Sequence, residues 1–319
     1  ILLKALRRFG AKADYYIPHR LHEGYGLNKE ALAGLKLRGA DLVVTVDCGI
    51  SCAEEAEYAK EIGLTLLITD HHQAPEVLPD TPVLMNPVLM ENPGPKKVAD
   101  VVPLTGDNRL LVMEGLKRLN KSPSCGLGAL IGVSGLEEKE ISTGHIAFAL
   151  SPRLNAAGRM DRPGEGLELL LAEDPAQAAL QAEKLDGINR LRQETESRIM
   201  EEAEKVLQEN PELPEEPILV VAGRSWHQGV IGVVASRLME RYHKPSLLIS
   251  LEDGKGKGSG RSVPGFSLYD ALTYAAPALL AYGGHPMACG FSLTEDALPE
   301  FRRLIGEYGR RYLECGPVE

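Results

Sequence analysis

Short apolar runs alternate with amphipathic stretches in the first third of the chain. Residues 51–63 have the spacing of a helix, with Ser51 as the expected N-cap and Gly63 as the expected C-cap. The continuous apolar runs are typical of strands covered on both faces, and four predict strands: 41–47, 64–70, 81–87 and 98–104. This strand–helix–strand order predicts a parallel sheet covered by helices.

Helical patterns dominate the middle of the chain. Residues 107–171 are expected to be mostly helical, and residues 175–211 form one long pattern of good helix formers between Pro175 and Pro211. About 35 helical residues would span ~50 Å, more than one domain needs, so we expect a helix that connects two domains. The expected organisation is a domain over 1–174, a connecting helix over 175–211 and a second domain over 212–319.

The last third predicts a smaller α/β domain. The expected strands, helices and glycine-rich basic stretch follow in the order 215–223 (strand), 229–243 (helix), 244–250 (strand), 255–263 (glycine-rich), 267–282 (helix) and 294–312 (helix). The fold class predicted for the whole chain is therefore α/β, with a parallel-sheet domain joined by a long helix to a smaller α/β domain.

Composition narrows the class of protein. The chain has 319 residues, enough for two cores, and its 44% hydrophobic and 25% charged content is typical of a globular protein. No apolar run approaches the ~20 residues of a membrane span. Five cysteines without C-x-x-C spacing argue against a disulfide framework or a structural zinc site and predict a cytoplasmic location. The net charge of −10 argues weakly against a general nucleic-acid coat protein, but not against a local basic groove.

Acidic residues stand where the predicted strands end. Asp47 and Asp70 close their runs, Asp100 lies in the fourth run, and His71 and His72 directly follow Asp70. Ligands of parallel sheets collect beyond the carboxyl ends of the strands, where crowded carboxylates need a cation. Oxygen ligands with an imidazole suit Mn²⁺ or Mg²⁺. Two ordinary interpretations remain: Asp47 as a helix cap, and the histidines as polar loop residues.

The second domain offers its own candidates for binding. His285 follows Gly283 and Gly284, which would let a backbone approach a ligand closely, although a surface turn explains them equally well. The stretch 255–263 places Lys255, Lys257 and Arg261 among glycines, which suits phosphates or, alternatively, a flexible hairpin.

Two further stretches allow two interpretations each. Residues 151–164 carry polar and basic side chains that would suit either phosphate binding or helix packing at a domain junction, namely Arg153, Asn155, Arg159 and Arg162. Trp226, the single Trp, precedes a predicted helix and would either stack on a base or anchor the core.

Seven stretches in order resemble the DHH phosphoesterase family with its DHHA1 companion domain: VTVDCGIS, ITDHH, VADVVPL, SPRLNAAGRM, WHQGVIGVVASRL, KGSGRS and GGHPMACG. The resemblance covers nearly the whole chain. It implies hydrolysis of phosphodiester or phosphoanhydride bonds with two divalent metals, Mn²⁺ or Mg²⁺. The stretches are most similar to the branch that degrades single-stranded DNA from the 5′ end to mononucleotides in recombination and repair.

The resemblance also implies roles for individual residues. Asp47, His71 and Asp100 would bind metal, His72 would contact the scissile phosphate or support the attacking water, and Asp70 would orient a histidine. Residues that match substrate-contacting segments of the family are Arg153, Asn155, Arg159, Ser259, Arg261, Gly283, Gly284 and His285. The implied partners are single-stranded DNA and, by family resemblance, single-strand-binding proteins and helicases.

Two features of the family are missing from the sequence. The aspartate-rich D-x-D-x-D-G loop is absent, and residues 1–10 resemble the helix that follows it, so we expect that residue 1 is not the true beginning of the protein. The family's helical stretch between Asn86-Pro87 and residue 98 is reduced to a short segment. The family also continues into an oligonucleotide-binding fold, which suggests a core fragment here.

Two other functions remain open from the sequence. A phosphoesterase of the same family could act on short oligonucleotides, cyclic dinucleotides or pyrophosphate. A non-catalytic DNA-binding scaffold is the third possibility, and the missing aspartate loop is the feature that favours it. The retained acids and histidines favour an enzyme.

Overall fold

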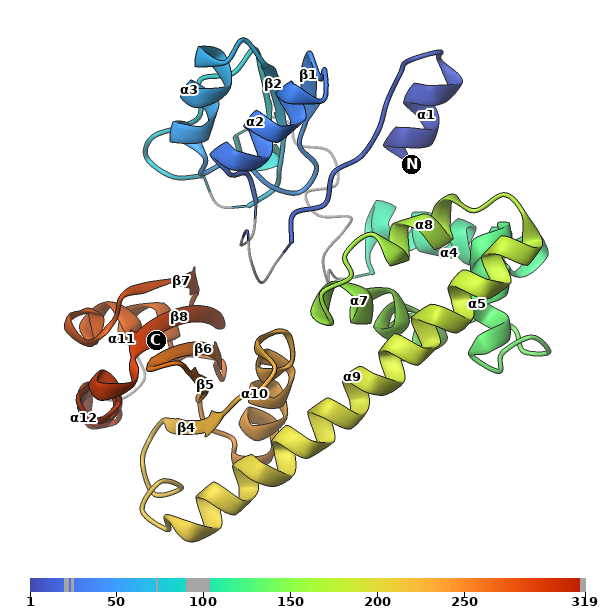
Figure 1. Cartoon of the computed structure of the whole chain (residues 1–319). Coiled ribbons are helices and arrows are strands. Elements are labelled where there is room, and N and C mark those ends of the chain that lie inside the picture. Colours follow the sequence, from blue (N-terminus) through green and yellow to red (C-terminus); the bar gives the residue numbers. More distant parts are fainter. Residues whose placement is uncertain (20–22, 24–25, 73, 90–103, 316–319) are drawn as a thin grey trace. The chain divides into compact units, whose positions relative to one another are not determined.

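The chain divides into two compact units, Ile1–Asp186 and Gly187–Glu319. The computed structural model describes residues 1–19, 23, 26–72, 74–89 and 104–315. In Figure 1 the first unit runs from blue to green and the second from yellow to red. Both units combine strands with helices, so the predicted α/β class is confirmed.

The first unit contains a three-stranded parallel sheet, here called sheet A, in the order β1-β2-β3. Its strands are β1 (Leu42–Val44), β2 (Thr65–Thr69) and β3 (Val83–Met85). The predicted strand at 98–104 lies outside the described residues, apart from Leu104. Helices α2 (Lys29–Leu37) and α3 (Ala53–Glu61) cover one face of sheet A, where Leu32, Leu66 and Ile68 form a core with other apolar side chains.

Helix α3 begins later than the capping pattern predicts. Its N-cap is Cys52, not Ser51, and the turn before the helix is closed by a hydrogen bond from Cys52 N–H to the carbonyl of Gly49. At the other end, Gly63 follows the C-cap Ile62 with φ 66, the left-handed conformation expected of a glycine there.

The rest of the first unit is helical, as the sequence predicts. Its helices are α1 (Leu2–Arg8), α4 (Gly106–Lys121), α5 (Cys125–Val133), α6 (Thr143–His145), α7 (Ser151–Arg159) and α8 (Glu165–Leu171). A π-helical turn over Ile146–Leu150 leads directly into α7. Such turns are rare and occur frequently at functional sites.

One helix, α9 (Pro175–Glu209), spans 35 residues and confirms the predicted long helix. The division between the two units falls inside it, between Asp186 and Gly187. In the first unit Asp186 accepts a hydrogen bond from Arg153 Nε of α7 at 2.8 Å. In the second unit Glu196, which is 1% exposed, pairs with Arg192 and with Arg237 of α10. Ion pairs of the buried acids Asp186 and Glu196 therefore fix the helix to its neighbours in each unit.

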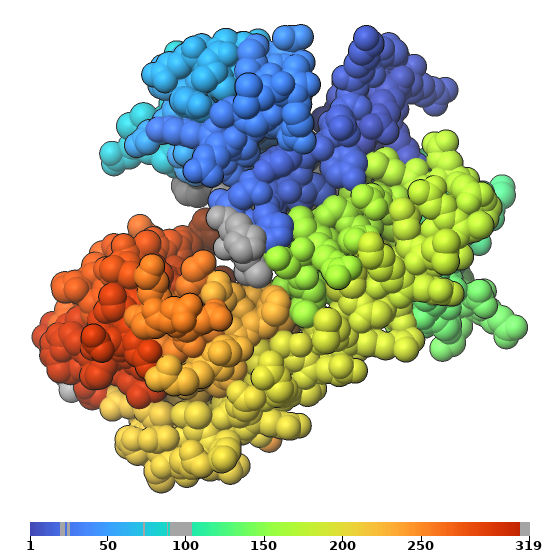
Figure 2. All heavy atoms as spheres, in the orientation of Figure 1, coloured from blue at the N-terminus to red at the C-terminus, as the bar shows by residue number. Residues whose placement is uncertain are grey.

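The second unit is built on a five-stranded mixed sheet, here called sheet B, in the order β4-β5-β6-β8-β7. Its strands are β4 (Leu219–Arg224), β5 (Ser246–Glu252), β6 (Lys255–Arg261), β7 (Ala281–His285) and β8 (Ala288–Thr294). Helix α10 (Gln228–Tyr242) packs on β5 and β6, while α11 (Leu268–Tyr274) and α12 (Leu298–Cys315) share a core with the opposite face. In Figure 2 the orange and red atoms of these elements form one packed body.

Two sequence predictions for this unit are wrong in detail. The helix expected over 267–282 ends at Tyr274 and is followed by a 3₁₀ turn over Ala276–Ala278 and then by β7. Pro277 explains the early end, because proline lacks the N–H that an α-helix needs. The last helix starts at Leu298 rather than at 294, after a 3₁₀ turn over Glu295–Ala297.

Candidate active site at the rim of sheet A

Four of the predicted site residues meet at the carboxyl end of sheet A. Asp47, Asp70, His71 and His72 each offer a ligand atom, and these atoms lie within 4.8 Å of one another. Asp47 comes three residues after β1, and Asp70 directly follows β2. The remaining predicted ligand, Asp100, lies outside the described residues.

Asp47 occupies an uncommon backbone conformation. Its φ is 67°, in the left-handed region that non-glycine residues rarely adopt, and its N–H donates to the carbonyl of Thr69 at 3.0 Å. The carboxylate is about half exposed, and its Oδ1 lies 2.6 Å from Nε2 of His71. Asp47 is not the N-cap of α3, so the capping alternative is wrong. Strained backbone that persists next to titratable side chains is typical of functional sites.

Asp70 has a different environment and a different role. It is only 6% exposed, and its carboxylate accepts from Ile50 N–H at 2.9 Å and from His72 Nδ1 at 2.6 Å. The backbone N–H groups of His71 and His72 donate to the same carboxylate. With its oxygens used in this way, Asp70 closes the turn before α3 and holds the histidine ring.

The hydrogen bonds around Asp70 decide its charge. Burial acts to raise the pKa of this carboxyl, but the hydrogen bond from Ile50 N–H and those from His72 and His71 outweigh burial and lower the pKa. Asp70 is therefore a carboxylate at neutral pH and accepts only, so Nδ1 of His72 must carry the proton. This leaves Nε2 as the ring nitrogen of His72 that a ligand could contact.

Asn86 supports His72 and was missed by the sequence interpretation. It directly follows β3, is 1% exposed, and its Nδ2 donates to the carbonyl of His72 at 2.9 Å. The N–H of Asp70 in turn donates to the carbonyl of Met85. A polar residue at the end of a third parallel strand is the signal that would have pointed to it.

The donor set fits a hard divalent cation. Asp47 and His71 present an oxygen and a nitrogen 2.6 Å apart at a half-exposed rim, and carboxylate with imidazole suits Mn²⁺ or Mg²⁺. Burial, followed by the nearby charge of Asp70, raises the pKa of the Cys48 thiol to about 11. Cys48 is therefore a neutral thiol at neutral pH, and it is not one of the four residues whose ligand atoms converge at this rim.

Sheet B places most of the second group of predicted residues on one face; Gly284, which pairs with the buried Cys289, belongs to the opposite side. Cross-strand partners point to the same side of a sheet. Arg261 pairs with Ala288 and Ala288 with His285, while Ser259 pairs with Gly290 and Gly290 with Gly283. We call the part of this side on β7 and β8 the open face; its residues are Ala281, Gly283, His285, Ala288, Gly290 and Ser292. All six are exposed or partly exposed, and the neighbouring β6 adds Lys257, Ser259 and Arg261.

The glycine-rich stretch at 255–263 is a regular strand, so the flexible-hairpin alternative is wrong. Its glycines face the core: a Cβ on Gly258 would lie 2.1 Å from the ring of Phe291. The residues between them face the other way, and there Arg261 donates from one guanidinium nitrogen to Gly260 O at 2.6 Å and to Ser259 Oγ at 3.3 Å. The alternation therefore turns the glycines to the core on one side and the polar side chains to the side of α10 and the open face on the other.

Four other candidates have positions that do not point to ligand binding. Arg153 of α7 is tied to Asp186 and to the carbonyl of Ala149, so packing is the role that its contacts describe. Asn155 is exposed and Arg159 partly exposed on the same helix. Trp226 is 2% exposed and its Nε1 donates to Glu202 Oε2 at 2.6 Å. The tryptophan is thus a core anchor and not a base-stacking residue.

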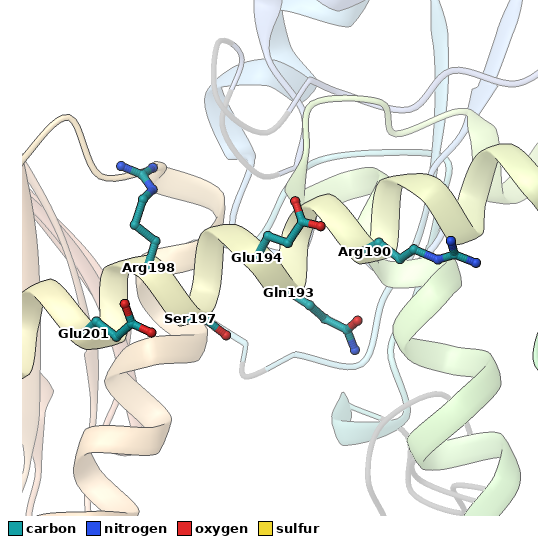
Figure 3. A pocket seen from close by; sticks show the side chains of 6 residues that line it. All are labelled: Arg190, Gln193, Glu194, Ser197, Arg198 and Glu201. Carbon is teal, nitrogen blue, oxygen red and sulfur yellow. The ribbon is translucent and has the colours of Figure 1, made fainter.

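A hollow of about 480 Å³ lies along the second-unit part of α9 and is drawn in Figure 3. All the residues that line it are polar or charged and come from one helix: Arg190, Gln193, Glu194, Ser197, Arg198 and Glu201. Two arginines and two glutamates balance in charge, so the hollow offers neither the ligands of a metal nor the one-sided charge of a phosphate site. The rim of sheet A remains the stronger candidate for chemistry.

Comparison with known proteins identifies the domains that contain these residues. Residues 1–99 match the N-terminal domain of the DHH family, and residues 215–310 match the DHHA1 domain. The chain belongs to the DHH family and carries its DHHA1 domain. The first match contains the acid and histidine rim, and the second contains sheet B.

The individual relatives are bacterial exonucleases. The chain is 34% identical to the single-stranded-DNA-specific exonuclease RecJ of Bacillus subtilis (strain 168) over 340 residues, which cover 96% of this chain and 43% of that protein. It is also 34% identical to RecJ of Escherichia coli (strain K12) over 368 residues, which cover 97% of this chain and 63% of that protein. The chain therefore spans about half the length of the curated relatives it matches.

Solved structures support the same relationship. A crystal structure of exonuclease RecJ bound to manganese matches with a TM-score of 0.81 and 33% identity, covering 98% of this chain and 86% of that one. RecJ from Thermus thermophilus in complex with Mn²⁺ matches with a TM-score of 0.83 and 31% identity, covering 98% and 49%. Its Mg²⁺ complex matches with a TM-score of 0.65. Within the described part of the chain, no helix is long and apolar enough to cross a bilayer.

Proposed function

We propose that this chain is a metal-dependent exonuclease that hydrolyses single-stranded DNA from its 5′ end to mononucleotides. The observation that carries the proposal is the convergence of Asp47, Asp70, His71 and His72 at the rim of sheet A. Relatives named as single-stranded-DNA-specific exonucleases, and RecJ structures solved with Mn²⁺ or Mg²⁺ bound, support it.

Asp47 and His71 are the proposed metal ligands, with Asp100 as a third. When bound, the divalent cation supplies Lewis acidity: it lowers the pKa of water and neutralises charge on the phosphoryl group. Asp47 brings the negative charge that holds the cation at the rim. Its fixed backbone conformation keeps the carboxylate in place before the metal arrives, which reduces the cost of organising the site.

His72 is the proposed group that acts on the substrate. Its Nδ1–H is held by Asp70 at 2.6 Å, which fixes the ring and its tautomer. Nε2 is then the atom that would either donate to a phosphate oxygen or accept a proton from water. Asp70 is proposed as a positioning residue, since its carboxylate is already engaged by four donors.

The open face of sheet B is the proposed binding surface for the DNA backbone. Lys257, Arg261 and His285 supply positive charge or donors, and the small residues between them permit close approach of a sugar-phosphate chain. Ser259, Gly283 and Gly284 belong to the same proposal, as do Arg153, Asn155 and Arg159 of α7. Phosphate contacts of this kind give affinity without sequence preference, as an exonuclease requires.

The proposal also has a cellular part. We place the activity in the cytoplasm and in DNA recombination and repair, with single-strand-binding proteins and helicases as partners. The predicted domain limits at 174 and 211 are part of the same proposal.

A cleavage assay tests the proposed function. The chain is incubated with Mn²⁺ and single-stranded DNA labelled at the 5′ or the 3′ end, with a duplex and a dinucleotide as comparison substrates. We expect a labelled mononucleotide to appear at once from the 5′-labelled strand and the duplex to survive. Preference for the dinucleotide would support the small-substrate phosphoesterase instead, and binding without any cleavage would support the scaffold.

A further inference from the structure

Two exposed tyrosines meet at the edge of sheet B. Tyr282 belongs to the edge strand β7 and Tyr269 to the first turn of α11, which packs against that strand. Their ring centroids are 6.0 Å apart, and the ring planes are inclined at 49°. Tyr282 is 36% exposed and Tyr269 is 42% exposed. Exposed aromatic rings that cluster in this way mark a surface with area left to bury.

The pair lies beside the open face. Tyr282 precedes Gly283 in β7, so its side chain points to the other side of the sheet from Gly283 and His285. It is three residues from His285, which is ~10 Å along a strand. Because β7 is the edge strand, no further strand of the described sheet separates the open face from the tyrosines. A chain that crosses the open face reaches the tyrosines by passing over this edge.

We propose that Tyr269 and Tyr282 form a stacking platform for bases of single-stranded DNA whose backbone crosses the open face. The inference rests on the function proposed above and extends it to the bases. Phosphates would lie near Lys257, Arg261 and His285, and the bases of neighbouring nucleotides would stack on the tyrosines. Every base has an aromatic face, so such a platform holds single strands without sequence preference, whereas paired bases in a duplex do not present that face.

The surroundings of the pair favour a base over a phosphate. Leu280 and Met287 stand just beyond the two ends of β7 and are 62% and 45% exposed, which extends the apolar character of the edge.

The same edge is a poor template for a strand from a protein partner. Gly284 in the middle of β7 has φ 136°, outside the conformations of regular strands. An added strand would therefore meet an interrupted row of backbone donors and acceptors. Stacking depends on the rings alone and is not affected by this interruption.

Binding measured with and without bases tests the platform. The full chain and its variants are titrated with fluorescent oligo(dT) in EDTA, which prevents cleavage, and with a matched oligomer of abasic residues. Tyr269→Leu with Tyr282→Leu keeps apolar bulk but removes the rings, and we expect about five- to hundredfold weaker binding to oligo(dT). The matched variants Tyr269→Phe and Tyr282→Phe should bind as the wild type does, and the abasic oligomer should not distinguish any of these proteins.

Equal affinities for oligo(dT) in the wild type and the leucine variants would overturn the platform, as would an equal loss on the abasic oligomer. The first result would assign the edge to a protein partner or to no partner. If the double variant does not fold, each leucine substitution is measured alone by the same criteria. Metal-dependent cleavage by the wild-type chain is recorded in parallel: cleavage without an effect of the tyrosines removes only the platform, whereas the absence of cleavage removes the proposed function.

Discussion

Sheet A and sheet B use their strands in opposite ways. In sheet A the strands are short and apolar, and the polar groups stand beyond their carboxyl ends, where Asp47, Asp70 and two histidines crowd within 4.8 Å. In sheet B the candidate binding groups lie on the strands themselves, spaced two residues apart on β6 and β7. Loop ends can bring several side chains to one point, which suits chemistry, whereas a strand face spreads them along a line, which suits a polymer.

The largest effect is expected from a substitution at the rim of sheet A, where the side chains converge. Asp47→Asn removes the charge, while asparagine tolerates the left-handed φ of this position. We expect Mn²⁺-dependent cleavage to fall at least ~10³-fold, because the metal's ligand charge is lost. Calorimetric titration should show weaker binding of Mn²⁺, and circular dichroism should show an unchanged fold. Turnover like that of the wild type would contradict the role of Asp47.

A second substitution separates positioning from ligation at the same rim. Asp70→Asn removes part of the hydrogen bonding that holds His72. We therefore expect a loss of kcat of roughly 10- to 100-fold. Binding of single-stranded DNA should remain unchanged, because the substitution lies outside the open face. An equal loss of DNA affinity would show that Asp70 does more than position the ring.

Asp70 also predicts a pH dependence of stability. Because its pKa is lowered in the folded chain, it stabilises the fold above the unfolded pKa of about 3.9, and this contribution disappears as the pH falls through the folded value. Urea unfolding of the metal-free protein should therefore show a loss of stability below about pH 4 that is smaller in Asp70→Asn. Identical acid profiles for the two proteins would contradict the hydrogen-bonding account.

A pair of glycine substitutions sharpens the description of sheet B. Gly258→Ala would drive a Cβ into the ring of Phe291, and we expect it to destabilise the chain by about 1–3 kcal/mol. Gly283→Ala is the matched control, since nothing lies within 4 Å of its added Cβ. It should leave urea unfolding unchanged and weaken DNA binding a few-fold by occupying the open face. Reversed results would mean that the two sides of the sheet have been assigned wrongly.

The smallest effect is expected from a substitution beside the open face of sheet B, where the candidate binding groups are spread along the strands. Lys257→Ala removes one exposed positive charge beside the open face, and the slope of log affinity for single-stranded DNA against log salt should fall by ~1. Lys117→Ala on α4 is the control, because Lys117 is equally a surface lysine but lies in the first unit. Equal changes in the two variants would argue against a dedicated phosphate surface.

The sequence predicted the elements better than it predicted their details. The strand–helix order of the first unit followed from periodicity and the long helix α9 from the prolines at both ends, whereas β6, β7 and β8 were not predicted as strands. Asp47, Asp70 and the histidines could be expected at one rim, because parallel strands end together. The left-handed φ of Asp47 and the hydrogen bond from Ile50 N–H to Asp70 depend on the tertiary turn at Gly49 and Ile50, which no local pattern encodes.

In sheet B, the alternation typical of a strand was present in the sequence but was interpreted as a loop. Lysine, serine and arginine alternate with glycine from 255 to 261, which is the period of a strand, yet glycine suggested a flexible loop. Only the position of Phe291 opposite Gly258 explains why glycine is needed. Trp226 illustrates the same limit, since burial against Glu202 decides between an anchor and a stacking residue.

The backbone at Asp47 has a consequence for how this chain can change. Glycine or asparagine would hold a φ of 67° at lower conformational cost, but neither carries the charge that the rim requires. A laboratory selection for heat resistance alone should therefore replace this aspartate, whereas a selection for turnover should retain it. At position 47, the amino acid that favours thermal stability is therefore different from the one that the proposed catalysis needs.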